Sequence, residues 1–186
     1  MDAPEYVPGH DLLADRIVVV TAAAGAGIGF AVAKKAVEEG ATVVISDVHE
    51  RRLDEAADVL AELSGDRPVT SLCDVRDENQ VQGLLDAAVA AHGRIDVMVN
   101  NAGLGGDTPL VEMQDDEWER VLDITLTGAM RCTRAAMRIM GEQGHGVIVN
   151  NASVLGWRAQ AGQSHYAAAK AGVMALTRCS AMEAAG

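Results

Sequence analysis

The 186-residue chain is poor in aromatic residues, in basic residues, in cysteine and in long apolar runs. Although 49% of its residues are hydrophobic, no run approaches the roughly 18 to 20 uninterrupted apolar residues that a membrane span needs. The first ten residues carry Asp2 and Glu5, with neither a basic start nor an apolar stretch that could act as a secretion signal. We therefore expect no membrane partner. Residues 1–11 are expected to form an N-terminal arm before the folded domain.

Basic residues are outnumbered by acidic ones, 15 against 27, which gives a formal net charge of −12. Such a charge opposes binding to phosphate backbones, so we expect no nucleic-acid partner. Cys73, Cys132 and Cys179 are widely separated and form no C-x-x-C pair, which fits reduced thiols in the cytoplasm. Each lies in an apolar stretch, so we expect three small buried residues, and we assign no metal site.

From residue 16 onward, short apolar β-branched runs alternate with longer segments of helical period. This alternation predicts one α/β domain over residues 12–186, with helices on both faces of a doubly wound parallel sheet. The expected strands are 17–21, 42–47, 68–74, 96–101 and 147–152. The expected helices are 29–39, 50–63, 77–92, 115–140 (with Gly128 as a weak point) and 164–184.

A glycine-rich turn joins the first expected strand to the first expected helix. Gly25, Gly27 and Gly29 alternate there, after Thr21 and around Ile28. Bare glycine backbone allows a dinucleotide pyrophosphate to approach amide groups and a helix N-terminus, whereas side chains would hold the phosphates away. The pattern by itself also fits a plain strand-to-helix turn.

Asp47 ends the second expected strand, twenty positions beyond Gly27. An acid at this place accepts hydrogen bonds from the adenosine ribose and repels a 2′-phosphate, which favours NAD over NADP. Arg51 and Arg52 follow closely and keep NADP possible, since either could turn towards a phosphate. The alternative is that Asp47 is only a residue of the turn after the strand.

Tyr166 and Lys170 are four positions apart in the last expected helix, and they therefore share one helical face. A lysine ammonium stabilises a neighbouring phenolate, which makes the tyrosine a usable acid or base near neutrality. The pair alone would also fit an ordinary amphipathic helix. Ser153, thirteen positions before Tyr166, adds a hydroxyl at the end of the fifth expected strand.

Taken together, the glycine turn, Asn100-Asn101-Ala102-Gly103, Ser153 and Tyr166-x-x-x-Lys170 resemble the short-chain dehydrogenase/reductase family in order and spacing. The resemblance runs from about Leu12 to the last residue. It implies a Rossmann-type fold and reversible hydride transfer between a nicotinamide cofactor and a secondary alcohol or ketone.

The resemblance also implies a role for each motif. Ser153 would hydrogen-bond the substrate oxygen, Tyr166 would exchange the proton, and Lys170 would also hold the nicotinamide ribose. The cofactor would further be lined by Asn101, Ala102 and Gly103, and its adenine ring would lie at Asp74 and Val75.

Three features depart from the family pattern. The glycine turn is one residue longer, with Ala23 where the first glycine would fall and Gly25 inserted nearby. Thr125 stands where the family carries an asparagine that kinks the long helix and anchors a water, so we expect an altered proton relay. The family continues past the Tyr-Lys helix with further strands and a substrate-covering loop, so we expect this chain to be a fragment whose fifth strand has a free edge.

Substrate and assembly are indicated only by similarity. The amino-acid sequence of residues 21–29 and 6–10 resembles that of actinobacterial family members that act on steroid-ring or acyl-CoA intermediates. Family members commonly pair through the helices that correspond to 115–140 and 164–184, so we expect a homo-oligomer.

Two other functions remain open. An S-adenosylmethionine methyltransferase could also use a glycine-rich turn and an acid at the end of the next strand, but it would give Ser153, Tyr166 and Lys170 no joint role. A truncated or inactive cofactor-binding module is the other alternative, because of Thr125 and the early end of the chain.

Overall fold

A computed structural model of the chain describes residues 5–185 and shows a five-stranded parallel sheet in the order β3-β2-β1-β4-β5. The doubly wound sheet predicted from the sequence is confirmed. β3 is shorter than the expected 68–74, because the Asp74 carboxylate accepts the Arg76 backbone N–H at 3.0 Å and turns the chain there. The strands are β1 (Ile17–Val20), β2 (Thr42–Asp47), β3 (Val69–Leu72), β4 (Val97–Asn100) and β5 (Val147–Asn150).

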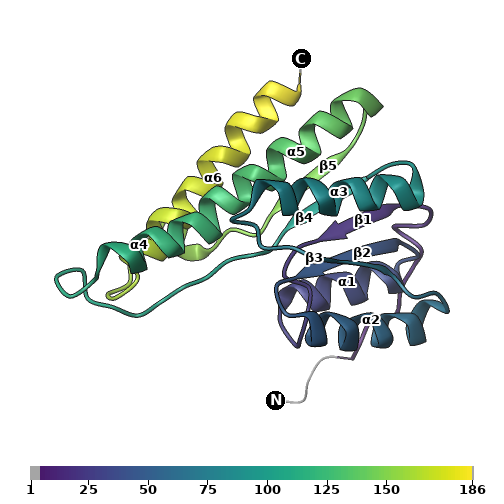
Figure 1. Cartoon of the computed structure of the whole chain (residues 1–186), viewed down its shortest axis with the longest axis horizontal. Coiled ribbons are helices and arrows are strands. Elements are labelled where there is room, and N and C mark those ends of the chain that lie inside the picture. Colours follow the sequence, from purple (N-terminus) through teal and green to yellow (C-terminus); the bar gives the residue numbers. More distant parts are fainter. Residues whose placement is uncertain (1–4, 186) are drawn as a thin grey trace.

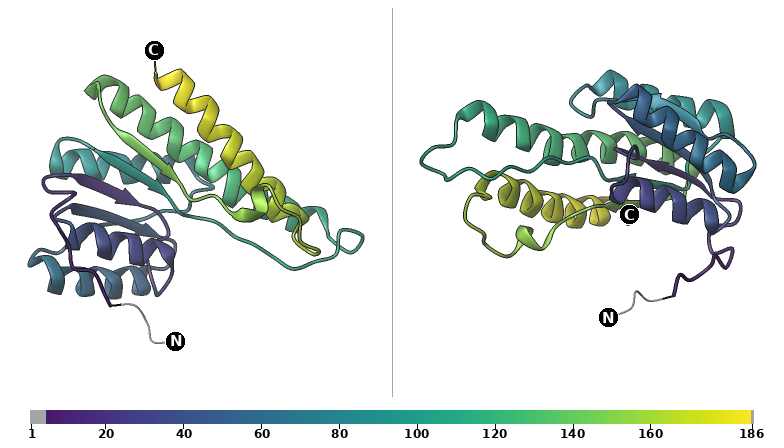
Figure 2. Two further views of the ribbon diagram at one scale, coloured as in Figure 1. Left: turned by 180° about the vertical axis from the view of Figure 1, so that it is seen from behind. Right: turned by 90° about the horizontal axis from the view of Figure 1, so that it is seen from below.

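Helices cover both faces of the sheet (Figures 1 and 2). On one face lie α1 (Ile28–Glu38) and α2 (Glu50–Ser64), and on the other lie α3 (Glu78–His92), α5 (Gly128–Gln143) and α6 (Ser164–Ala184). The change of face follows from right-handed crossovers, because the chain first adds β2 and β3 on one side of β1 and then β4 and β5 on the other. The winding reverses between β1 and β4, which is where such sheets form a ligand crevice.

Alternate residues of the central strand belong to two separate cores. Val19 packs with Met98 under α3 and α5, whereas Val18 and Val20 pack against α1 and α2. All three valines are buried, since β1 lies in the middle of the sheet with a strand on each side. This two-sided burial explains the continuous apolar runs in the sequence.

The long helix differs from the prediction of a weak point at Gly128. It begins as α4 (Asp115–Leu122), passes through a π-helical turn at Asp123–Thr127 and continues as α5. Gly128 does not break the helix; it allows close packing, because a Cβ there would lie 2.6 Å from Val75 Cγ2. The irregularity therefore lies at Thr125 and its neighbours, and the helix ends three residues later than expected, at Gln143 rather than residue 140.

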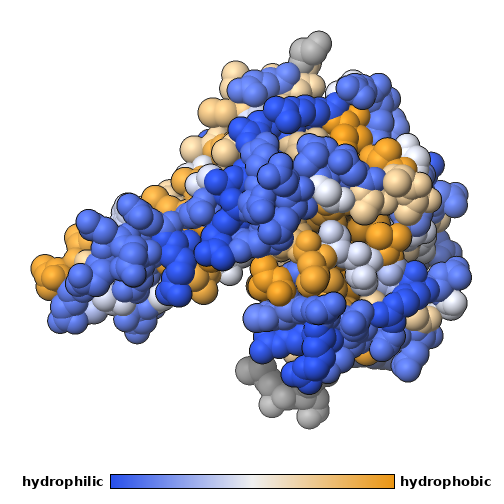
Figure 3. All heavy atoms as spheres, viewed as in Figure 1, coloured by the Kyte–Doolittle hydropathy of each residue, from blue (hydrophilic) through white to orange (hydrophobic). Residues whose placement is uncertain are grey.

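A protruding arm extends beyond the carboxyl ends of the strands (Figure 1). It consists of residues 104–114, α4 and the start of α6. Figure 3 shows apolar surface at its tip, where Leu110 and Val111 are 65% and 94% exposed. β5 forms one edge of the sheet in the described residues, as expected, with Val147 and Val149 exposed.

The expectation of three buried cysteines needs one correction. Cys73 and Cys132 are buried as predicted, but Cys179 is exposed, because its position on α6 faces outward.

Within residues 5–185, no helix is both long enough and apolar enough to cross a membrane.

The N-terminal arm is attached to the end of α1. Residues 1–4 lie outside the described part, but the Glu39 carboxylate accepts the backbone N–H groups of His10 and Leu12 at 2.8 and 3.2 Å. Lys35 Nζ lies 3.0 Å from the same carboxylate. These contacts, led by the His10 hydrogen bond, lower the pKa of Glu39 from 4.5 to about 2.

The turn after β1 combines tight backbone geometry with a close approach. Ala22 and Gly25 have positive φ angles of 51° and 75°. Glycine adopts such an angle freely, so the strained residue of the turn is Ala22, one position before Ala23, where the family pattern has its first glycine. A Cβ at Gly29 would lie 2.3 Å from Ala22 O and 2.4 Å from Asn101 Nδ2. Gly29 therefore brings α1 against the ends of β1 and β4.

Replacing Glu39 with glutamine tests the attachment of the N-terminal arm to the end of α1. A carboxyl group with a lowered pKa stabilises the fold fully above about pH 4.5, and this contribution disappears as the pH falls towards 2. We expect E39Q to be less stable than wild type at pH 7, with a difference that shrinks below pH 4.5. Chemical denaturation across this range measures it, with the exposed Glu62→Gln as control; a difference independent of pH would contradict the interpretation.

Gly29→Ala tests the close approach at the turn. The added methyl group meets backbone and a committed amide, so we expect the free energy of unfolding to fall by about 1–3 kcal/mol. Gly83→Ala is the matched control, because no atom lies within 4 Å of its Cβ position in α3; we expect it to stabilise the chain by up to ~1 kcal/mol. Urea denaturation measures the free energy of unfolding of both variants, and equal stability of G29A and wild type would refute the packing argument.

Candidate active site

A hollow of about 370 Å³ opens at the carboxyl ends of β1, β2 and β4. It lies at the reversal of strand order, where parallel sheets bind ligands. Residues predicted as cofactor contacts from three separate parts of the sequence line it together. They are Asp47, Asp74, Val75, Ala102 and Gly103.

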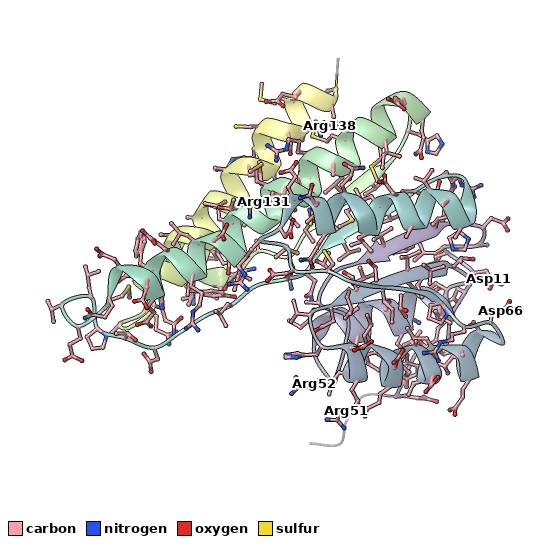
Figure 4. All side chains as sticks on the ribbon, viewed as in Figure 1. Asp11, Arg51, Arg52, Asp66, Arg131 and Arg138 are labelled. Atoms are coloured by element: carbon pink, nitrogen blue, oxygen red, sulfur yellow. The ribbon has the colours of Figure 1, made fainter. Side chains whose placement is uncertain are left out.

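The half-buried Asp47 carboxylate is held towards the glycine turn. Its two oxygens accept the backbone N–H groups of Ala24 at 3.2 Å and His49 at 3.1 Å. Arg51 and Arg52 project outward from the start of α2 (Figure 4), and Arg51 pairs with Glu55 at 3.1 Å. In this arrangement the acid, not either arginine, faces the hollow.

Asp74 and Val75 also line the hollow. The Arg76 guanidinium donates to both oxygens of Asp74 and lowers the pKa of that carboxyl. Arg131 reaches across from α5 (Figure 4), donating to the backbone carbonyl of Val75 at 3.3 Å and to Asp123 at 2.8 Å. Val75 is buried, so these contacts hold its backbone in place.

The glycine turn leaves bare backbone beside the hollow. No atom lies within 4 Å of a Cβ built at Gly25 or Gly27, whereas Gly29 is covered by protein. Ile28, between them, is 66% exposed. A cradle of open backbone next to a hollow with an acid at the strand end fits the phosphates and ribose of a dinucleotide.

Thr21 and Asn101 lie beneath this cradle and hold it together. Thr21 Oγ1 accepts the backbone N–H groups of Asn101 and Ala102 at 3.0 and 3.1 Å. The Asn101 side chain donates to the carbonyls of Thr21 and Ala22 at 3.1 and 3.0 Å. Both residues join β1 to β4, so their groups are committed to the protein backbone.

Asn151 continues this network, and the sequence interpretation missed it. Its amide donates to Asn101 Oδ1 at 2.9 Å, and its carbonyl accepts a hydrogen bond from Lys170 Nζ. A signal was present, because an Asn-Asn pair ends both β4 and β5, and the register pairs Asn100 with Asn150. Equivalent polar residues at the ends of neighbouring parallel strands come to the same edge of the sheet.

Tyr166 and Lys170 lie on one face of α6, as predicted, with Lys170 Nζ 5.6 Å from the centroid of the Tyr166 ring. Lys170 is buried, and this burial lowers the pKa of its ammonium group. Among residues 5–185 no carboxylate lies within 4.0 Å of Nζ. A negative charge that formed on the Tyr166 oxygen would therefore meet a cation that has no carboxylate partner.

Gly103 connects the hollow to this pair. A Cβ built at Gly103 would lie 3.5 Å from Lys170 Nζ and 3.7 Å from Thr125 Oγ1. The same residue lines the hollow that Asp47 borders. The hollow therefore reaches the lysine that lies against the Tyr166 ring.

Ser153 precedes a short 3₁₀ turn, Val154–Gly156, that packs on α6. A Cβ at Gly156 would lie 3.1 Å from the carbonyl oxygen of Lys170, so glycine permits the close contact. Ser153 Oγ accepts the backbone N–H of Leu155 at 3.2 Å, which leaves its hydroxyl hydrogen able to donate.

Thr125 is buried in the π-helical turn, and within residues 5–185 its hydroxyl hydrogen-bonds only to Leu104, directly after Gly103. Its hydroxyl donates to the Leu104 carbonyl and accepts the Leu104 N–H, both at 2.9 Å. Because the hydroxyl hydrogen is used in this way, the contact visible here is structural. The altered proton relay expected at Thr125 stays a prediction.

Comparison with known proteins identifies the group to which these features belong. A family described as "short chain dehydrogenase" matches residues 16–186. A hexahydro-indene-carboxyl-CoA reductase of Mycobacterium tuberculosis is 62% identical over 98% of this chain and 70% of its own length.

Solved structures agree with this match. A short chain dehydrogenase from Mycobacterium smegmatis has a TM-score of 0.95 and 60% identity over 99% of this chain and 77% of its own. An NAD⁺-bound xylitol dehydrogenase has a TM-score of 0.89 and 34% identity over 94% of this chain and 66% of its own.

The alternatives raised by the sequence lose support in this comparison. The relatives are named as reductases and dehydrogenases, which does not favour an inactive module and gives no support to a methyltransferase. Enzymes of this group are oxidoreductases that act on CH–OH donors and generally use NAD or NADP. The chain belongs to the short-chain dehydrogenase/reductase family.

Proposed function

We propose that this chain interconverts a secondary alcohol and a ketone, with Tyr166 exchanging the proton. The observation that carries the proposal is the junction at Gly103, where the hollow bordered by Asp47 meets Lys170 on the helix that carries Tyr166. A hydride donor in the hollow and a proton donor on α6 would then act on one carbonyl group from two sides.

When bound, the nicotinamide supplies or accepts the hydride at the substrate carbon. In the reducing direction, the Tyr166 phenol gives its proton to the carbonyl oxygen as the alcohol forms, and solvent then returns a proton to the phenolate. Ser153 donates a hydrogen bond to the same oxygen and holds it. Lys170 offsets the negative charge on Tyr166, an effect strengthened by its burial.

We propose NAD rather than NADP as the cofactor. Asp47 faces the hollow with a carboxylate fixed by two backbone N–H groups, and a 2′-phosphate there would meet like charge. Arg51 and Arg52 are exposed and turned outward, so they would have to move to bind that phosphate. Asp74, Val75 and Gly103 would line the adenine and the path to the nicotinamide.

For the substrate we propose a cyclic, steroid-derived ketone or alcohol, carried as an acyl-CoA. The 62% identical relative is named for a fused-ring carboxyl-CoA compound, and its match covers the whole proposed catalytic set. Four residues after Ser153, Trp157 is 68% exposed, and the Arg158 guanidinium lies 5.2 Å from the centroid of its ring. A flat apolar face and a cation so close in sequence to Ser153 suit a fused ring and an anionic carrier.

Assembly and location complete the proposal. We propose that copies of the chain pair through α4, α5 and α6, the helices expected for this from the sequence. A cytoplasmic location is proposed as well, since NAD-dependent chemistry and free thiols both fit that compartment.

Fluorescence titration with NADH, NADPH and S-adenosylmethionine tests the cofactor. We expect NADH to bind about tenfold more tightly than NADPH, because the 2′-phosphate of NADPH would be repelled by Asp47. A tenfold factor needs only ~1.4 kcal/mol of repulsion, and two like charges near a protein surface can repel each other by about 4 kcal/mol. Asp47→Asn should narrow the preference. Tighter NADPH binding would overturn the assignment of NAD, and binding of S-adenosylmethionine alone would overturn the function.

Tyr166→Phe tests the proton donor on a panel of a decalone, a cyclohexanone and acetoacetyl-CoA with NADH. We expect kcat to fall by roughly 10²–10⁴-fold, the usual contribution of a positioned acid, while NADH affinity stays within twofold. The exposed Tyr6→Phe is the control. Undiminished turnover by Y166F would remove Tyr166 from the mechanism.

A further inference from the structure

The segment 104–108 forms a wall beside Tyr166. It begins directly after Gly103 and runs along the protruding arm. Gly105 lies over the tyrosine ring, because a Cβ built there would be 3.6 Å from Tyr166 Cδ2. The position of this segment therefore limits where a substrate can lie relative to the proton donor.

Two hydrogen bonds join this segment to the residues before α6. The backbone N–H of Thr108 donates to the Gly162 carbonyl at 3.0 Å. The side-chain amide of Gln163 donates to the carbonyl of Gly106. The segment is therefore fixed to the same stretch of chain that leads into Tyr166.

Glu117 and His165 fix the segment from a second side. His165 immediately precedes Tyr166 on α6, is fully buried, and has Nε2 3.4 Å from Glu117 Oε1 on α4. The same carboxylate oxygen accepts a hydrogen bond from Thr108 Oγ1 at 2.7 Å. A Cβ at Gly106 would lie 2.5 Å from His165 Nε2 and 3.1 Å from Glu117 Oε1, so its backbone lies against both groups.

The choice of histidine at position 165 needs an explanation. A fully buried imidazole is costly unless its nitrogens have partners, and a leucine would fill similar space without that cost. Within residues 5–185, Glu117 is the one acidic residue with an oxygen within 4.0 Å of a nitrogen of this ring, and neither nitrogen makes a well-aligned hydrogen bond. What the imidazole adds over an apolar side chain is its contact with Glu117.

We propose that Glu117 and His165 are positioning residues for the reaction, joined in a clasp that holds segment 104–108 against the Tyr166 ring. The clasp acts through Thr108 and Gly106, and neither Glu117 nor His165 touches the reacting atoms. This inference rests on the proposed function, because it takes Tyr166 as the proton donor. It assigns the shape of the substrate end to residues outside the Ser-Tyr-Lys set.

The clasp contacts the segment at Gly106 and Thr108, away from the hollow. Of segment 104–108 only Leu104 lines the hollow with Asp47 and Asp74, and Thr125 holds Leu104 separately. Loosening the clasp should therefore alter how the substrate is oriented and leave cofactor binding as it is. A residue that served only the general stability of the fold would not separate these two effects.

The test compares Glu117→Ala, Glu117→Gln and His165→Leu with a control, Glu119→Ala. Glu119 is exposed on the same helix, so the control makes the same change in charge. For each variant of the full chain, hydrogen exchange of amides 104–108, NADH affinity, and kcat and KM for an active ketone of the panel are measured.

For E117A and H165L we expect about tenfold or more loss in kcat/KM and about tenfold faster exchange in segment 104–108, with NADH affinity within twofold of wild type. E117Q should recover most of the loss, because its amide oxygen can still accept from Thr108 Oγ1. E119A should resemble wild type.

Two results would overturn the clasp. One is exchange and kinetics of E117A that match those of E119A. The other is an equal loss of NADH affinity and kcat/KM, which would show a general loss of structure. The failure of the proposed function is a different result: wild type and Y166F would then be alike on every ketone, and the exchange of segment 104–108 would still decide whether the clasp holds that segment.

Discussion

The site depends on a chain of hydrogen bonds between amide groups at the carboxyl ends of β1, β4 and β5. The Asn101 side chain holds the backbone of the glycine turn, Asn151 holds Asn101, and Lys170 donates to the Asn151 carbonyl. One continuous network therefore runs from the bare backbone beside the hollow to the cation behind Tyr166. Each bond has a small net effect, about 0.5–1.5 kcal/mol, but an unpaired buried amide would cost more.

This network needs the strands in fixed register, and contacts at the amino ends of the strands help to fix that register. Asp96, only 5% exposed, precedes β4 and accepts the Ile17 N–H at 2.8 Å and the Arg94 guanidinium at 2.9 Å. β1 and β4 are thus joined by a carboxylate at one end and by amides at the other. A slip of one residue would turn Val19 and its neighbours to the wrong face, which both cores oppose.

The sequence predicted the features that depend on local pattern. Alternating β-branched runs gave all five strands, and spacing placed Tyr166 and Lys170 on one face of α6. Asp47 was predicted because it ends the second expected strand, twenty positions beyond Gly27. Neighbouring parallel strands also end on the same side of the sheet, and this rule, applied to the two Asn-Asn pairs, would have indicated Asn151.

Features that depend on contacts between distant segments were missed. The π-helical turn lies where Thr125 bonds to Leu104, and helical periodicity carries no signal for a partner 21 residues away. The outward face of Cys179 and the attachment of the arm to Glu39 likewise follow from packing. The approach of Glu117 to His165 joins two helices through a glycine between them, which neither helix predicts alone.

The two ends of the site are built in different ways, and this difference has a consequence for specificity. The nucleotide end rests on strand ends whose geometry is fixed by two cores and by the amide network. The substrate end rests on segment 104–108 and the 3₁₀ turn after Ser153, both outside the sheet and held by side-chain contacts with α4 and α6. Substitutions in these segments should therefore change the space beside Tyr166 without moving the strand ends. A common cofactor fold can therefore serve many alcohols and ketones, since the segments proposed to contact the substrate are not the segments that hold the sheet in register.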